Sequence, residues 1–64
     1  MYGRLYQELK VRGITQAELA GRLGVSKFTI HHKLSGKSEF TASEMYAICE
    51  LITDVPMHEL FKKN

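Results

Sequence analysis

The chain of 64 residues contains no tryptophan, a single proline and a single cysteine. Cys49 has no second cysteine to pair with, so no internal disulfide can stabilise the fold, and we expect a reduced, cytoplasmic setting. No apolar run approaches the roughly 20 residues that a membrane-spanning helix needs, and the first residues lack the apolar segment of a signal peptide. We therefore expect one small domain, residues 1–64, that holds together by its hydrophobic core alone.

The sequence also lacks the residue patterns of catalytic and metal sites. It contains no phosphate-binding loop and no dinucleotide fingerprint. His31 and His32 point about 100° apart on a helix and cannot easily share a metal ion, and His58 belongs to another segment. Cys49 has no basic residue at helical spacing and is expected to be a small buried hydrophobe. We predict a protein that is not an enzyme and has no metal, cofactor or small-molecule ligand.

The positive charge is concentrated in one part of the chain. The net charge is +2, but residues 1–37 hold seven Lys and Arg against two Glu, whereas residues 38–64 hold two Lys against five acidic residues. A basic half favours a polyanionic partner such as nucleic acid. Scattered charges can equally well only solvate helix surfaces, so charge by itself does not decide between these interpretations.

The spacing of apolar residues predicts about five short helices and no strand, because no segment alternates apolar and polar residues over a strand's length. The first helix runs from Tyr2 to about Arg12 and ends at Gly13. The fourth starts at a capping box of Thr41 and Glu44, and the fifth spans Met57 to Phe61 after Pro56. The apolar faces of the first and fourth helices comprise Tyr2, Leu5, Tyr6, Leu9, Met45, Ile48, Cys49 and Ile52. The expected fold is an all-α compact bundle.

Residues 15–34 predict two short helices that meet at a tight turn. Thr15 and Glu18 form a capping box that starts the first helix. Gly24 suits the left-handed backbone at its end, and Ser26 offers an N-cap hydroxyl for the second helix. The residues expected to pack the two helices together are Leu19, Ala20, Leu23, Gly24, Val25, Ile30 and Leu34. This arrangement is a helix-turn-helix.

The chain resembles the phage repressor and Cro-type helix-turn-helix family, also called lambda-repressor-like, over nearly its whole length. The resemblance rests on residues at the family's offsets, namely Gln16, Ala20, Gly24, Val25 and Ile30. One position departs from the pattern, because Lys33 stands where the family has an apolar residue and Leu34 follows it. The run KLSGKSEFT, residues 33–41, is shared by some phage-repressor-like members and indicates a subfamily variant.

The resemblance implies that the second helix of the motif enters the major groove of DNA with its amino terminus first. The side chains then expected nearest to the bases are Ser26, Lys27, Phe28, His31 and His32, although the two histidines can reach either bases or phosphates. Gln16 anchors a phosphate by resemblance. Further candidates for contacts with the DNA backbone are Thr15, Lys33, Ser35 and Lys37.

Two classes of function fit these features. The favoured one is a sequence-specific transcription regulator, a phage or prophage repressor or a Cro-like protein, that binds a pseudo-palindromic operator in double-stranded DNA as a homodimer. The alternative is a protein-interaction module of the antitoxin or anti-repressor type. The expected self-association surface is Val55, Met57, Leu60 and Phe61, unless Leu60 and Phe61 only cap the core. The chain is then either a compact Cro-like protein or a DNA-binding fragment.

Overall fold

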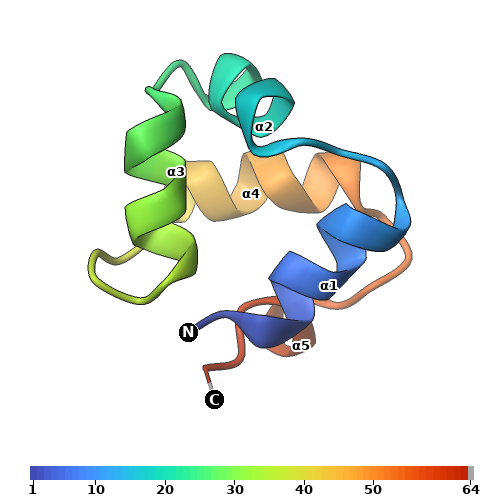
Figure 1. The fold of residues 1–64 in the computed structure, drawn as a ribbon. Helices are drawn as coiled ribbons and strands as arrows, with labels where there is room; N and C mark the ends of the chain where they lie inside the picture. The colour runs from blue at the N-terminus through green and yellow to red at the C-terminus, as the bar shows by residue number, and fades with distance from the viewer. Residues whose placement is uncertain (64) are drawn as a thin grey trace.

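The computed structural model describes residues 1–63, which form five α-helices and no strand (Figure 1). The prediction of an all-α bundle is confirmed. In Figure 1, α2 and α3 meet at one end of the molecule, and α1 and α5 lie at the other end. The bounds are Gly3–Val11 for α1, Gln16–Leu23 for α2, Lys27–Leu34 for α3, Ala42–Leu51 for α4 and Met57–Leu60 for α5.

Side-chain caps start the three central helices as predicted. Thr15 Oγ1 accepts the backbone N–H of Glu18 at 3.1 Å, and the Glu18 carboxylate accepts the backbone N–H of Thr15 at 3.2 Å. Thr41 and Glu44 form the same reciprocal box at α4. Gly24 ends α2 with a φ of +71°, a left-handed conformation that is strained for any residue with a Cβ. The corner between α2 and α3 is therefore fixed by local sequence.

The core is formed by the apolar faces of all five helices. Leu5, Leu19, Ile30, Ile48 and Leu60 are completely buried, so each helix contributes at least one side chain that is removed from water. The rings of Tyr2, Phe40 and Phe61 meet edge to face and close one end of the core. Tyr6, on the apolar face of α1, is 40% exposed and lies at the rim of the core.

The carboxyl-terminal helix differs from its prediction in two respects. Its helical residues end at Leu60 rather than Phe61, and Pro56 directly before it is the N-cap residue. Val55 and Leu60 were expected on a self-association surface, but they are 7% and 0% exposed. Leu60 therefore follows the alternative in which it caps the core, and the expectation of an exposed Val55 is wrong, because a chain this short needs both side chains for its own core. Met57 and Phe61 remain partly exposed.

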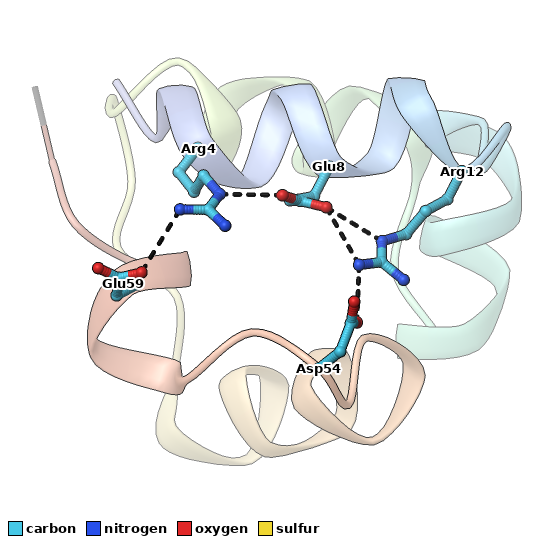
Figure 2. Close-up of polar contacts among 5 residues, drawn as sticks. All are labelled: Arg4, Glu8, Arg12, Asp54 and Glu59. Carbon is cyan, nitrogen blue, oxygen red and sulfur yellow. Dashed lines mark hydrogen bonds and ion pairs between the residues drawn. The ribbon is translucent and has the colours of Figure 1, made fainter.

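A row of ion pairs holds α1 against the carboxyl-terminal part of the chain (Figure 2). Glu8 bonds to Arg4 at 2.9 Å and to Arg12 at 3.1 Å, and Arg12 continues to Asp54 at 2.7 Å. Arg4 also reaches Glu59 of α5 at 3.5 Å. Hydrogen bonds from Arg4 and Arg12 lower the pKa of the Glu8 carboxyl. This face of α1 is therefore committed to holding the fold together.

Candidate nucleic-acid interface

The helix α3 is attached to the body by one face and leaves the opposite face open. Ile30 and Leu34, one turn apart, are buried against the core. Ser26 caps the helix, because its Oγ accepts the backbone N–H of Thr29 at 3.1 Å. Lys27 and Phe28 follow directly in the first turn and are exposed. The start of α3 therefore presents a lysine and an aromatic ring to solvent.

Phe28 and His32 form a pair on the open face of α3. The Phe28 side chain is 70% exposed, and its ring lies 4.3 Å from the His32 ring, centroid to centroid. Because the two residues are one helical turn apart, this contact restricts both side chains. The open face of α3 therefore carries an exposed aromatic ring in contact with an imidazole ring.

His31 faces a different part of the molecule from His32. It lines a shallow hollow of about 70 Å³ together with Tyr6, Gln16 and Ser35. The sequence left open whether the two histidines reach bases or phosphates. In the structure, the His32 ring contacts Phe28, whereas His31 lines a hollow together with Gln16, the first residue of α2.

Lys33 lies away from the open face, contrary to its prediction as a phosphate contact. Its Nζ donates to Glu44 Oε1 at 2.6 Å and lies 5.9 Å above the Phe40 ring, and only 12% of the side chain is exposed. This contact explains the departure at position 33, because the lysine stem covers the apolar ring while its charge is neutralised by α4.

The remaining predicted backbone contacts surround the same face. Lys37 is exposed and follows Gly36, whose φ of +90° turns the chain after α3. The Ser35 hydroxyl donates to the backbone carbonyl of His32 at 2.9 Å, and the Thr15 hydroxyl is engaged in the α2 capping box. Gln16 is half-buried at the amino terminus of α2. Of this set, Lys37 offers the least constrained side chain.

The ion pairs divide the cations of the basic half into two groups. Arg4, Arg12 and Lys33 are bound to carboxylates. Lys10, Arg22, Lys27 and Lys37 are exposed and form no ion pair within residues 1–63. The cations available to a polyanion are therefore on α1, α2, α3 and the loop after α3, and not along the Arg4–Arg12 face drawn in Figure 2.

Sequence analysis missed two residues of α1 beside this surface. Tyr6 and Lys10 line a second hollow, of about 170 Å³, that adjoins the first and shares Tyr6, Gln16 and Leu34 with it. Their spacing of four residues places them on one face of α1, but neither residue was proposed as a contact to DNA. Both hollows are smaller than the roughly 300 Å³ at which sites for drug-sized molecules begin.

Other kinds of site find little support in the described part of the chain. No group of three or more His, Cys, Asp and Glu side chains there could hold a metal ion. Burial raises the pKa of the Cys49 thiol, which disfavours the nucleophilic thiolate. No helix within residues 1–63 has both the length and the apolar character needed to cross a membrane.

Comparison with known proteins agrees with this geometry. The model of the family described as "Cro/C1-type HTH DNA-binding domain" matches residues 4–62. No curated protein and no solved structure matches the chain. The match includes α2, the Gly24 turn and α3, and it extends through α5. The chain therefore belongs to the family of Cro/C1-type helix-turn-helix DNA-binding domains.

Proposed function

We propose that this DNA-binding domain is a sequence-specific transcription regulator of the phage repressor or Cro type, which acts in the cytoplasm by occupying an operator. The observation that carries the proposal is the open face of α3, where Lys27, Phe28 and His32 stand together while Ile30 and Leu34 hold the helix against the core. A helix anchored on one side and exposed on the other fits the major groove of B-form DNA.

Each side chain on this face has a chemically distinct role. Lys27 donates to guanine O6 or N7, and the Phe28 ring contacts the methyl group of a thymine. His32, held against Phe28, donates to a base beside it. Ser26 stands at the tip of the helix, where its hydroxyl is close to the bases while its cap keeps the first turn in place.

The DNA backbone is contacted around the edge of α3. Gln16 and the first backbone N–H groups of α2 donate to one phosphate, with Thr15 beside them. Ser35 and Lys37 contact the strand beyond the other end of α3, and His31 donates to the backbone near Gln16. Lys33 has no part in this set because its charge is bound to Glu44.

A homodimer on a pseudo-palindromic operator completes the proposal. One recognition helix contacts only a few base pairs, and two-fold dimers with half-sites about 34 Å apart supply the missing specificity. Met57 and Phe61 are the apolar side chains of the α5 region that remain partly exposed. They offer a small contact, so we expect dimerisation to depend on DNA.

Selection of bound duplexes from a random pool tests this function. The proposal predicts enrichment of one sequence with two-fold symmetry, bound by two chains per duplex in sedimentation. Met57→Glu should fold normally and bind the same duplex with lower cooperativity, whereas Tyr46→Glu, at an exposed position of α4, should bind as wild type. A pool that shows no enriched sequence would contradict sequence-specific regulation and favour a protein-interaction module.

A further inference from the structure

Two adjoining hollows form a groove between α1 and the helix-turn-helix. The smaller is lined by Met1, Tyr6, Gln16, His31, Leu34 and Ser35, and the larger by Tyr6, Leu9, Lys10, Ile14, Gln16 and Leu34. Tyr6, Gln16 and Leu34 are common to both. We call the combined surface the α1 groove. It includes Gln16, the first residue of α2. By helical spacing, its α1 members Tyr6 and Lys10 lie on another face of the helix than Arg4 and Glu8, whose ion pairs are drawn in Figure 2.

Most of the exposed lining of the α1 groove is apolar, and polar side chains contribute a small part of it. It includes no carboxylate, and its polar members are a lysine, a histidine, a tyrosine hydroxyl, a glutamine and a serine. These groups attract or hydrogen-bond an anion. The remaining walls are apolar, which is compatible with the C–H surface of a deoxyribose.

Lys10 is the one lysine in the groove lining, and its charge is free for a ligand. It is exposed and forms no ion pair with any described residue. The other cations of α1, Arg4 and Arg12, are held by Glu8 and Asp54. The helix therefore has a neutralised face toward α5 and a cationic face toward the groove.

We infer that the α1 groove binds the sugar–phosphate backbone of the DNA duplex, as a continuation of the surface centred on α3. The inference rests on the proposed function, because Gln16, His31 and Ser35 belong both to that surface and to the groove. Lys10 pairs with a phosphate, and the Tyr6 hydroxyl donates to an oxygen of the same strand. The occupant is one strand of double-stranded DNA, and the contact carries no sequence information.

The salt dependence of DNA affinity distinguishes the contribution of Lys10 from that of Tyr6. Lys10→Gln should weaken binding to selected and shuffled duplexes by the same factor and reduce the slope of log K against log salt by about 1, since one fewer counterion is released. Tyr6→Phe should weaken both duplexes by roughly fivefold and leave the slope unchanged, because a neutral hydrogen bond is lost. Lys62→Gln, an exposed lysine beyond α5, is the matched control and should change neither quantity.

A duplex with single neutral methylphosphonates, placed at each position in turn, locates the contact. One position outside the half-site should weaken the wild type and leave Lys10→Gln unaffected. If Lys10→Gln and Lys62→Gln give the same slope while wild type still prefers the selected duplex, the α1 groove does not bind DNA and the proposed function stands. If wild type binds no duplex, both proposals are overturned. Circular dichroism melts confirm that the variants are folded.

Discussion

At the scale of single residues, Glu44 holds two helices at once. One carboxylate oxygen accepts both the Thr41 backbone N–H at 2.8 Å and the Lys33 ammonium at 2.6 Å. Burial raises the pKa of this carboxyl, but the bonds from Lys33 and Thr41 outweigh burial and lower it overall. The cap of α4 and the orientation of α3 are therefore linked through one side chain.

Lys33→Met tests this internal role against a role at the phosphates. Loss of the ion pair should destabilise the fold by about 1 kcal/mol, since the pair is mostly shielded from water. In urea unfolding, a cycle with Glu44→Gln should show that the two substitutions are not additive. The salt slope of DNA binding should be unchanged. A slope reduced by about 1, as expected for Lys37→Met, would instead show that Lys33 leaves Glu44 and binds a phosphate.

If the exposed Phe28 ring contacts a thymine methyl group, the affinity for DNA should depend on that methyl group. Replacing a contacted thymine by uracil removes one methyl group, which should weaken wild type roughly fourfold at about 0.8 kcal/mol per buried carbon. Phe28→Ala should bind the thymine and uracil duplexes equally well. Fluorescence anisotropy on the paired duplexes makes the comparison. The same uracil penalty in both proteins would place the ring away from the methyl group.

At the scale of elements, alanine substitutions at Gly21 and Gly24 of the α2 segment are expected to change the stability of the fold in opposite directions. Gly21 is in the middle of α2, and a Cβ there would meet no atom within 4 Å. Gly24 has equally open surroundings, but its φ of +71° is the conformation that ends the helix. Space is not limiting at either position, so backbone conformation alone distinguishes them.

Gly21→Ala should stabilise the fold by about 0.5 to 1 kcal/mol, because alanine favours the helix and restricts the unfolded chain. Gly24→Ala should destabilise it by about 1 kcal/mol, since the left-handed conformation is strained for alanine. Each kcal/mol shifts the Tm of a domain of this size by several degrees, so thermal melts resolve both effects. A stabilised Gly24→Ala would mean that the turn between α2 and α3 can adopt another conformation.

The ion pairs between α1 and the carboxyl-terminal segment predict loss of stability in acid. Hydrogen bonds from Arg4 and Arg12 lower the pKa of Glu8, and the pKa of Asp54 is lowered by a bond to its own backbone and by Arg12. A lowered folded-state pKa gives stability that is complete above the unfolded value, near 4, and is lost as pH falls through the folded value.

Glu8→Gln tests the contribution of this row of charges. Relative to wild type, the variant should have a lower Tm at pH 7, and the difference should shrink as the pH falls below about 4 toward the lowered pKa at which the folded wild-type carboxyl becomes protonated. Glu50→Gln removes an exposed carboxylate that has no ion pair within the described chain, and its Tm should follow wild type at every pH. If the difference in Tm between Glu8→Gln and wild type stayed constant down to pH 2, the ionised Glu8 carboxylate would not be the source of that stability.

At the scale of the whole molecule, one end of the bundle closes the core and the other end carries the helix-turn-helix. The end at α1 and α5 is closed by aromatic rings, by a hydrogen bond from the Tyr2 hydroxyl to Glu39 and by the ion pair of Glu39 with Lys63. The other end carries α2 and α3, with Arg22 and Lys27 exposed and in no ion pair within residues 1–63. In the proposed complex, α3 would therefore bind DNA through a surface that is separate from the contacts closing the core.

Sequence patterns predicted the local features and missed those that depend on tertiary contacts. Capping boxes at Thr15 and Thr41 and the turn at Gly24 involve neighbours within a few residues, so they could be recognised directly. The Lys33–Glu44 pair spans eleven residues and depends on how α3 packs on α4. The burial of Leu60 likewise depends on which apolar residues the small core needs. Helical spacing identifies an apolar face but not its degree of exposure.

The central claim is that α3 reads base sequence while the surrounding residues only hold the DNA backbone. The most direct test is anisotropy of wild type, Lys27→Ala and Lys37→Ala on the selected duplex and on a shuffled one. Lys27→Ala should lose about 1 to 3 kcal/mol on the selected duplex and little on the shuffled one, so its preference is relaxed. Lys37→Ala should weaken both duplexes equally. Equal losses on the two duplexes for both variants would contradict sequence reading by α3.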